Sequence, residues 1–371
     1  MSLSNASRIV LKIGSALLVD PKNGKLRQSW LTSLCADIAA LKEQRKDVII
    51  VSSGAIALGR ARLKLFGRSL SLAEKQACAA AGQSLLTQAY EQGLQPHGIM
   101  TAQALLTLHD TEDRRRWLNA RSTLDTLLKL GAIPVINEND TVATDEIKYG
   151  DNDRLAARTA QMLSADCLVL LSDINGLYTA DPRQDKNAMH IPNVLELTVE
   201  IMAMGGGINR FSSVGSGGMV TKLSAAKIAT KAGCHMCIMD GQDMAPISRL
   251  LAGEKSTWFK ATDNPKKARQ QWIAGSIKPC GVLTIDDGAA KALMSGKSLL
   301  AAGVTQITGR FLKGDAVSVK TFEGQEIARG LAAYDAAEAK KLLGVSSGDI
   351  INILGYDNGA ALIHRDNMVM I

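Results

Sequence analysis

Short apolar runs alternate with longer stretches of helical periodicity along the first two thirds of the chain. The apolar runs span residues 8–13, 47–52, 99–106, 132–137, 166–172 and 234–239, each bounded by polar residues or glycine. Near-continuous apolar character predicts strands of a parallel sheet that is buried on both faces. Residues 29–44 and 71–92 have the apolar spacing of helices. The pattern predicts an α/β domain with helices on both sides of a mainly parallel sheet.

The pattern changes near residue 280, where shorter segments are separated by polar turns. The segments with strand character span 281–286, 305–309, 315–320 and 325–334, and a short helical segment follows at 335–344. These features predict a small, mainly β domain after a linker that contains glycine and proline. We therefore divide the chain into a first domain at residues 1–275 and a second at residues 279–371.

Composition agrees with a two-domain globular protein. The chain has 371 residues, of which 46% are hydrophobic, 21% charged and only 4% aromatic, so its core must be mainly aliphatic. The net charge of +7 favours anionic ligands, but it is spread thinly and is weak support for nucleic acid binding. The N-terminal residues show neither a signal peptide nor a membrane span.

Six cysteines lie singly in apolar segments, as expected for a protein of the reducing cytoplasm. Cys234 and Cys237 form a C-x-x-C pattern, but on a predicted strand they would point to opposite faces. We therefore expect buried thiols at these positions and no protein-built metal site.

Candidate ligand-binding residues follow the predicted strands, because ligands of open α/β sheets gather at the carboxyl ends of the strands. Lys12 ends the first strand, and Ser53 and Gly54 open a helix after the second. A lone lysine at this place is most often solvated, and a serine–glycine pair is most often an ordinary helix cap. Neither signal is specific when taken alone.

The strongest polar signal follows the fourth strand. Its two clusters comprise Asn137, Glu138, Asn139 and Asp140, and then Asp145, Glu146, Gly150, Asp151, Asn152 and Asp153. Turn chemistry explains part of this composition, but not two such clusters between an apolar strand and a helix. The sequence predicts a polar ligand or a magnesium-bearing site here.

Two further segments favour a nucleotide. Ser172 and Asp173 end the fifth strand, and an exposed Tyr178 is expected after them, although a plain β-turn explains this segment nearly as well. A glycine-rich loop then enters a helix with Lys222 in its first turns. A helix N-terminus with a lysine suits phosphates, and a mobile surface loop is the alternative. Thr221 precedes the lysine, so the loop lacks the order of a Walker P-loop.

The motifs in their order resemble the amino acid kinase family. They are LKIGS (11–15), VSSGAIALG (51–59), PVINENDTVATDEIKYGDND (134–153), LLSDINGLYTADPR (170–183) and GSGGMVTK (215–222). The segments AGQSLL (81–86), LLTLHDTEDRRRWLNAR (105–121) and NENDTVAT (137–144) are similar to the members that phosphorylate L-glutamate, and the tail resembles a PUA domain. The likeness covers essentially the whole chain.

This resemblance implies ATP-dependent phosphorylation of the γ-carboxylate of L-glutamate, the first step of proline biosynthesis, with feedback inhibition by proline. Mg²⁺ would be coordinated by the ATP phosphates. The acceptor chemistry agrees, because a carboxylate with a pKa of about 4.3 is already ionised at neutral pH and needs no general base. The resemblance also implies a cytoplasmic homo-oligomer, a dimer or a tetramer, with no membrane association.

The resemblance assigns roles by motif position. Lys12 and Lys222 would contact the ATP phosphates and the transferring phosphoryl group, and Asp153 would orient both lysines. Glutamate would be bound by Ser53, Gly54, Asp140 and Asn152. The nucleotide would be bound by the two lysines together with Ser172, Asp173, Ser216, Gly217, Gly218, Met219, Val220 and Thr221.

Some features leave alternatives open. Ser52, Ser172 and Ser216 stand where threonine is common in the family, and Val220 stands where a small polar residue is common. The basic segment 111–121 is either a solvated helix face with internal ion pairs, or a wall of the glutamate pocket or subunit contact. The alternative acceptors are aspartate, acetylglutamate and a nucleotide. RNA binding by the tail is less favoured, because the tail lacks a basic face rich in aromatic residues.

Overall fold

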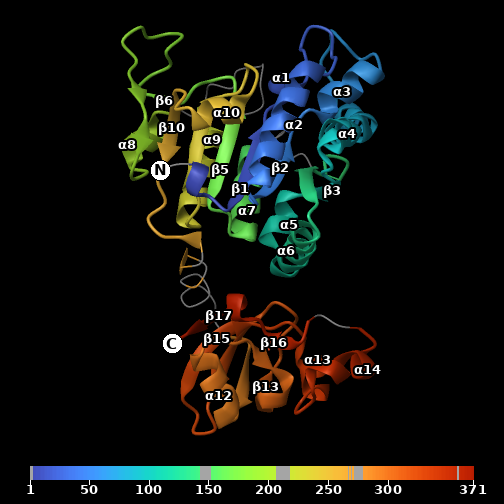
Figure 1. The fold of residues 1–371 in the computed structure, drawn as a ribbon, viewed down its shortest axis with the longest axis vertical. Coiled ribbons are helices and arrows are strands. Elements are labelled where there is room, and N and C mark those ends of the chain that lie inside the picture. Colours follow the sequence, from blue (N-terminus) through green and yellow to red (C-terminus); the bar gives the residue numbers. More distant parts are fainter. Residues whose placement is uncertain are drawn as a thin grey trace. The chain divides into compact units, whose positions relative to one another are not determined.

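The computed structural model describes residues 3–142, 152–205, 218–265, 267, 268, 270, 279–356 and 359–371. By its internal contacts the chain divides into two compact units (Figure 1). One comprises Met1–Glu112 with Ala120–Pro265, and the other comprises Asp113–Asn119 with Lys266–Ile371. Each unit is described by itself.

The first unit is built on an eight-stranded sheet with the order β3-β4-β2-β1-β5-β9-β10-β8. The strands are β1 (Arg8–Ile13), β2 (Asp47–Ser52), β3 (Thr101–Leu106), β4 (Ile133–Glu138), β5 (Cys167–Ser172), β8 (Asn193–Val194), β9 (His235–Asp240) and β10 (Ser256–Phe259). All neighbouring pairs are parallel except β9 and β10. The mainly parallel sheet expected from the apolar runs is therefore confirmed, and the antiparallel β10 is an addition to it.

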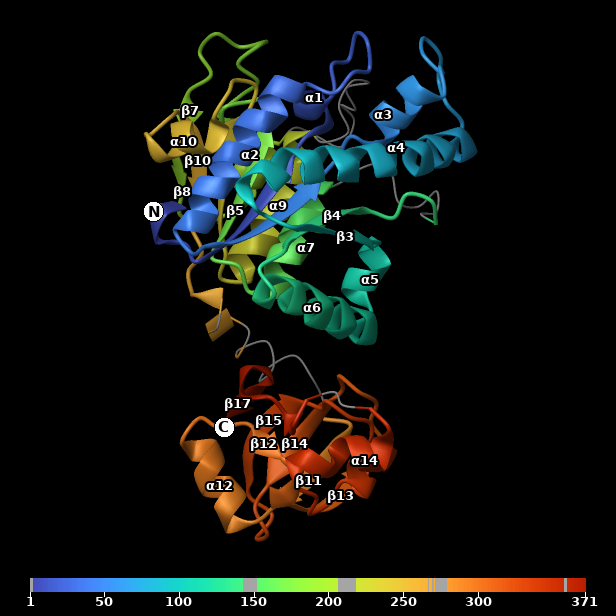
Figure 2. The same ribbon diagram turned by 45° about the vertical axis from the view of Figure 1, so that its right-hand side comes forward.

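Helices cover the sheet on both faces (Figures 1 and 2). They are α1 (Ser15–Leu18), α2 (Gln28–Glu43), α3 (Ala55–Arg62), α4 (Leu72–Leu94), α5 (Leu108–Glu112), α6 (Arg114–Lys129), α7 (Asn152–Leu163), α8 (Val199–Ala203), α9 (Met219–Lys231) and α10 (Pro246–Leu251). A short antiparallel pair, β6 (Leu177–Tyr178) with β7 (His190–Ile191), lies between β5 and β8 in the chain.

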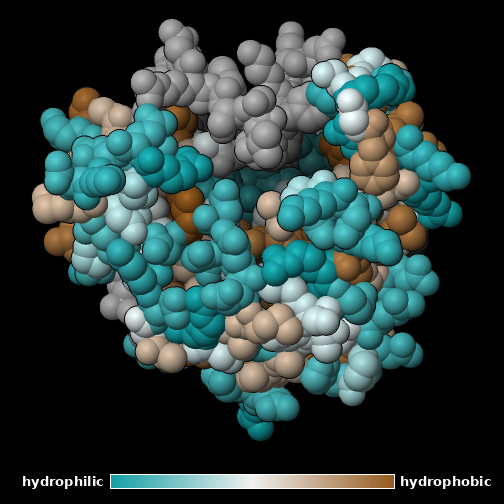
Figure 3. All heavy atoms as spheres, turned by 90° about the horizontal axis from the view of Figure 1, so that it is seen from above, coloured by the Kyte–Doolittle hydropathy of each residue, from teal (hydrophilic) through white to brown (hydrophobic). Residues whose placement is uncertain are grey.

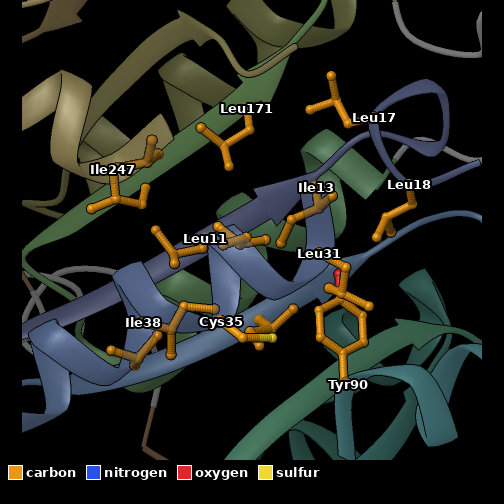
Figure 4. Close-up of a cluster of buried hydrophobic side chains, with 14 of the residues drawn as sticks. Leu11, Ile13, Leu17, Leu18, Leu31, Cys35, Ile38, Tyr90, Leu171 and Ile247 are labelled. Carbon is orange, nitrogen blue, oxygen red and sulfur yellow. The ribbon is translucent and has the colours of Figure 1, made fainter. Parts of the chain in front are cut away.

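Strand β1 places its side chains alternately on the two faces of the sheet. Leu11 and Ile13 belong to a buried apolar cluster that includes Leu31 of α2, Tyr90 of α4 and Ile247 of α10 (Figure 4). Lys12, the residue between them, therefore points to the opposite face. That face is covered by α7 and α9, so the strand presents one lysine to a helix-covered surface instead of to solvent.

Helices α3 and α4 touch through their backbones (Figure 2). A Cβ atom added to Gly59 would lie 1.7 Å from the carbonyl oxygen of Cys78, and one added to Gly82 would lie 1.9 Å from that of Ala55. Only glycine allows this approach. The contact fixes the start of α3, which carries the predicted residue Gly54, relative to α4.

Replacing Gly59 by alanine is expected to lower the free energy of unfolding by at least about 3 kcal/mol, because the new methyl group would force α3 and α4 apart. The better helix propensity of alanine offsets only about 1 kcal/mol of this. Denaturant titration measures the change, and Gly348→Ala, where a Cβ meets nothing within 4 Å, is the control. Equal stability of the two variants would contradict the close contact.

The second unit has a five-stranded sheet with the order β13-β11-β14-β15-β17. Its elements are β11 (Gly281–Ile285), α12 (Asp287–Met294), β12 (Leu299–Leu300), β13 (Val304–Gly309), β14 (Ala316–Lys320), β15 (Glu326–Leu331), α13 (Ala336–Lys341), α14 (Ile350–Leu354), β16 (Ala361–Ile363) and β17 (Met368–Met370). A separate apolar cluster, including Leu283, Val319 and Tyr334, forms its core. The expectation of a mainly β tail is confirmed, and α12 and α14 are helices that the pattern did not predict.

Two other findings bear on the sequence analysis. Five of the six cysteines are buried and Cys280 is exposed, and none of the six forms a disulfide. Across the described ranges, no helix is long and apolar enough to span a bilayer.

Candidate active site

The described part of the site is centred on Asp153, the second residue of α7. Lys12 of β1 places its Nζ 2.6 Å from Asp153 Oδ1, and Lys222 of α9 places its Nζ 3.0 Å from Asp153 Oδ2. The carboxylate is 1% exposed, Lys12 is 7% exposed and Lys222 is 3% exposed. Three elements that are distant in the sequence therefore bring one anion between two buried cations. Lys12 is not the solvated strand terminus that was the alternative.

The charges decide the protonation state of Asp153. Burial raises its pKa, but the ammonium groups of Lys12 and Lys222 outweigh burial and hold the pKa well below its ordinary range. The group is thus a fixed anion at neutral pH. Together the three side chains carry a net charge of +1, which suits the binding of a more highly charged anion such as a polyphosphate.

Helix α9 contributes its N-terminus to the same place. The Thr221 hydroxyl donates to the carbonyl of Gly218 at 2.8 Å and lies 3.2 Å from Asp153 Oδ2. Gly218, Met219 and Val220 form the start of this helix, and Val220 is exposed. The free N–H groups of the first turn favour phosphate oxygens. The predicted Ser216 and Gly217 lie outside the described residues.

Asn152, next to Asp153 and 3% exposed, is the centre of a second, uncharged cluster. Its Nδ2 donates to Ser53 Oγ at 2.7 Å and to Asn137 Oδ1 at 3.0 Å. Gly54 follows Ser53 with a φ of 115°, a left-handed conformation that favours glycine. Because Asn152 and Asp153 are adjacent, α7 joins the predicted substrate residues to the predicted phosphate residues.

Asp140 lies near the end of β4 and is partly buried. Burial raises the pKa of its carboxyl from 3.8 to about 6. Asp145 and Asp151, in the second acidic cluster, lie outside the described residues. An ammonium group of a ligand would compensate the buried charge of Asp140.

Strand β5 supplies the predicted nucleotide residues Ser172 and Asp173. The Ser172 hydroxyl donates to Asp173 Oδ1 at 3.0 Å, and the carbonyl of Ser172 accepts from Gly241 of the neighbouring β9 segment. Tyr178 differs from expectation. It is half-buried instead of exposed, because its ring packs edge-on against His190 of the paired strand β7, and Lys255 lies over its face.

Gln83 and Tyr90 of α4 also contact residues of the site, and no motif in the sequence predicts a role for them. Gln83 Oε1 accepts from Asn137 Nδ2 at 2.9 Å, and the hydroxyl of Tyr90 lies 2.9 Å from Ser52 Oγ. Their signal was present but weak: position 83 lies with Ala79, Leu86 and Tyr90 on the stripe of α4 that faces the sheet. A polar residue within an apolar stripe suggests a buried hydrogen bond.

The described residues do not build a metal cage by themselves. No cluster of three or more histidine, cysteine, aspartate or glutamate side chains with metal-binding geometry occurs within the described ranges. Both oxygens of Asp153 already face lysine ammonium groups. A magnesium ion at this site would therefore need oxygen ligands from bound phosphates.

The basic segment 111–121 overlaps α5 and α6. Arg121 forms an ion pair with Asp125 one turn further along α6, at 3.2 Å, and Asp113 Oδ1 accepts from the backbone N–H of Arg116. These local contacts suit the interpretation as a helix face with internal ion pairs. The other interpretation, a pocket wall or subunit contact, stays a hypothesis.

Comparisons with known proteins cover both units. The model of the amino acid kinase family matches residues 7–240, and the model of the PUA domain matches residues 281–354. Glutamate 5-kinase from Caulobacter vibrioides (strain NA1000 / CB15N) is 56% identical over 365 residues, which is 98% of this chain and 97% of the relative. Glutamate 5-kinase from Paramagnetospirillum magneticum is 56% identical over 99% of both chains. Glutamate 5-kinase 1 from Rhizobium meliloti is 56% identical over 100% of this chain and 93% of the relative.

Proposed function

The chain belongs to the amino acid kinase family, and we propose that it transfers the γ-phosphoryl group of ATP to the γ-carboxylate of L-glutamate. The observation that carries this proposal is Asp153 held between the buried Lys12 and Lys222, beside the uncharged cluster of Asn152. Relatives at 56% identity over nearly their whole length are named glutamate 5-kinase. Formation of a glutamyl hydroxamate in the presence of hydroxylamine is the test, designed in full in the Discussion.

In the proposed reaction, a γ-carboxylate oxygen attacks the γ-phosphorus, a new P–O bond forms, and the bond to the leaving ADP oxygen breaks. The products are γ-glutamyl phosphate and ADP. The attacking carboxylate is already ionised, so no side chain has to remove a proton. What the transition state needs is in-line placement and neutralisation of charge on the phosphoryl oxygens.

The two lysines meet this need. Lys12 would contact the ATP phosphates from β1, and Lys222 would approach the transferred phosphoryl group from the first turn of α9. Asp153 would hold both ammonium groups in place, and its low pKa rules it out as an acceptor of protons at neutral pH. The first turn of α9, with Gly218, would supply N–H groups to phosphate oxygens. When bound, Mg²⁺ would add further neutralisation at the phosphates.

Glutamate would bind at the uncharged cluster. Ser53 and the adjoining Gly54 would contact its carboxylates, and Asp140 with Asn152 would receive its α-ammonium group. Ser172 and Asp173, at the end of β5, would contact the nucleotide. Ser216, Gly217, Met219, Val220 and Thr221 complete the proposed phosphate loop.

The KM for glutamate is expected to rise as the pH falls below about 6, by up to about tenfold per pH unit, because protonation of Asp140 removes the partner of the α-ammonium group. Between pH 7 and pH 5 the ammonium and the γ-carboxylate of glutamate both keep their charge. Initial rates at several pH values measure the change. Asp140→Asn should have a higher KM that no longer depends on pH in this window. A pH-dependent KM that is the same in the variant would exclude Asp140 as the titrating group.

The proposed product places the enzyme at the first step of proline biosynthesis in the cytoplasm, and we propose proline as its feedback inhibitor. Unchanged activity at saturating proline would remove that part of the proposal. We further propose a catalytic domain at residues 1–275 and a structural or regulatory PUA-like domain at residues 279–371. A homo-oligomer, a dimer or a tetramer, is proposed from the family likeness alone.

A further inference from the structure

A chain of hydrogen bonds runs from β3 through α4 to the start of α7. The Thr87 hydroxyl donates to Gln103 Oε1 at 2.6 Å, and Gln83 Nε2 lies 3.4 Å from Thr87 Oγ1. Asn137 Nδ2 donates to Gln83 Oε1 at 2.9 Å, and Asn152 Nδ2 donates to Asn137 Oδ1 at 3.0 Å. The three side-chain amides of Asn152, Asn137 and Gln83 each donate in the direction of β3, and the Thr87 hydroxyl also lies 3.1 Å from the backbone carbonyl of Gln83. The series of hydrogen bonds therefore has a defined donor-to-acceptor direction, and it begins at Asn152 in the proposed glutamate site.

The donor-to-acceptor direction decides what the site offers to a ligand. Both N–H groups of Asn152 are used inside the protein, by Asn137 Oδ1 and by Ser53 Oγ. Asn152 Oδ1 is buried and has no hydrogen-bond partner in the part of the chain that the structure describes. Ser53 Oγ accepts from Asn152, so its own hydrogen remains to be donated. The cluster thus presents one acceptor and one donor side by side.

We propose that Gln83 is a positioning residue for the amino-acid end of the substrate. By accepting from Asn137 it holds the Asn137 amide, and through it the Asn152 amide, in the orientation that keeps the buried Asn152 Oδ1 unpaired within the described protein. That oxygen is then left as an acceptor for the ligand. The acceptor fits an α-ammonium group, and the hydroxyl of Ser53 fits a carboxylate. This inference rests on the proposed function and extends it to a residue that does not touch glutamate.

The opposite orientation would be unfavourable for this substrate. If Asn137 turned over, its Nδ2 would face Asn152, and Asn152 would have to present Oδ1 to it and direct N–H groups to the ligand. Two donors, the amide and the ammonium, would then oppose each other. Gln83 selects against this arrangement, because its own Nε2 is directed to Thr87 Oγ1, whose hydrogen has acceptors in Gln103 Oε1 and the Gln83 carbonyl. Gln83 Oε1 is therefore the atom that faces Asn137.

Two substitutions of Gln83 distinguish the effect of its acceptor oxygen from the effect of its packing. Gln83→Met keeps the length of the side chain and removes the acceptor, whereas Gln83→Glu keeps an acceptor oxygen. Gln83→Met is expected to raise the KM for glutamate about tenfold, the effect of one lost hydrogen bond to a positioned group. Gln83→Glu is expected to stay within about threefold of wild type, and the KM for ATP is expected to stay within about twofold in both.

Glutarate, which lacks only the α-ammonium group of glutamate, distinguishes positioning from general damage. As a competitive inhibitor it should bind Gln83→Met with nearly the wild-type Ki, because the contact that is lost is the one to the ammonium group. If Gln83 had only a structural role, its replacement would raise the Ki of glutarate and the KM for glutamate by the same factor. Thr87→Val, which removes the hydroxyl behind Gln83, should raise the KM for glutamate about threefold and leave glutarate unchanged.

The outcomes separate this inference from the proposed function. Absence of glutamyl hydroxamate with the wild-type enzyme would overturn the proposed function itself. Wild-type turnover with equal KM values in Gln83→Met and Gln83→Glu, or a parallel loss of glutarate binding, would overturn the positioning role alone. If Gln83→Met does not fold, as thermal unfolding would show, Thr87→Val with the glutarate comparison gives the same decision.

Discussion

Replacing Asp153 by asparagine is expected to lower the free energy of unfolding of the nucleotide-free enzyme by about 3–5 kcal/mol, because it leaves two buried ammonium groups without their shared anion. Lys12 and Lys222 are nearly inaccessible to water and would repel each other across the neutral amide. Asparagine has nearly the shape of aspartate, so the loss of stability reflects the removed charge and not a change in packing. Denaturant titration of both proteins at neutral pH measures the difference.

The effect of Asp153 on stability depends on pH with a defined sign. Its pKa is lower in the folded state than in the unfolded chain, so its contribution is fully present above a pH of about 4 and is lost as the pH falls towards the folded pKa. The difference between wild type and Asp153→Asn should therefore shrink in acid. Glu196→Gln, a neutralised carboxylate on the surface of the same unit, should change stability by less than about 0.5 kcal/mol. Equal losses in the two variants would contradict the buried ion triad.

Replacing Lys222 by alanine is expected to lower kcat by at least about 10²–10³-fold, since it removes a fixed positive charge next to the proposed transferring phosphoryl group. The chemical step should suffer more than ATP binding, because Lys12 and the N-terminus of α9 remain. Single-turnover measurements at saturating ATP and glutamate would separate the two effects. Lys227→Ala, an exposed lysine on the same helix, controls for the loss of one positive charge and should keep wild-type activity. Retention of more than about a tenth of kcat in Lys222→Ala would exclude it from the chemistry.

The periodicity of the sequence predicted the elements well because local patterns determine them. The apolar runs at 8–13, 47–52 and 166–172 correspond to three adjacent strands of the sheet. The same local patterns do not predict which strands pair across the sheet or in which direction they run. The strand Ser256–Phe259 is only four residues long and antiparallel to β9, and its direction depends on a contact that local periodicity does not encode.

The candidate site shows the same division. Lys12, Asp153 and Lys222 each have a weak local signal, and only the order of the family motifs predicts that they act together. Gln83 received no assignment, because its contact with Asn137 spans 54 residues and depends on where α4 lies against the sheet. Tyr178 was misplaced for a similar reason, since its ring is covered by a strand twelve residues further along. Local sequence patterns alone do not predict such contacts between distant segments.

The surface of the first unit and its buried charges differ in their exposure to water. Seen from above, the first unit presents many hydrophilic residues with apolar ones scattered among them (Figure 3). The proposed phosphate and glutamate contacts, at Lys222 and Asn152, are by contrast buried. Charges held away from water act more strongly on a developing negative charge than charges in solvent do.

The most direct test of the account is to trap the acyl phosphate. The enzyme is incubated with ATP, Mg²⁺, L-glutamate and hydroxylamine, and both ADP and hydroxamate are measured. Aspartate, acetylglutamate and UMP replace glutamate in parallel reactions, and Lys222→Ala is assayed beside wild type. The account predicts hydroxamate with glutamate alone, in step with ADP release, and its loss in the variant. Hydroxamate with another acceptor but not with glutamate, or ADP release from the glutamate reaction without hydroxamate, would contradict the phosphorylation of the γ-carboxylate of glutamate.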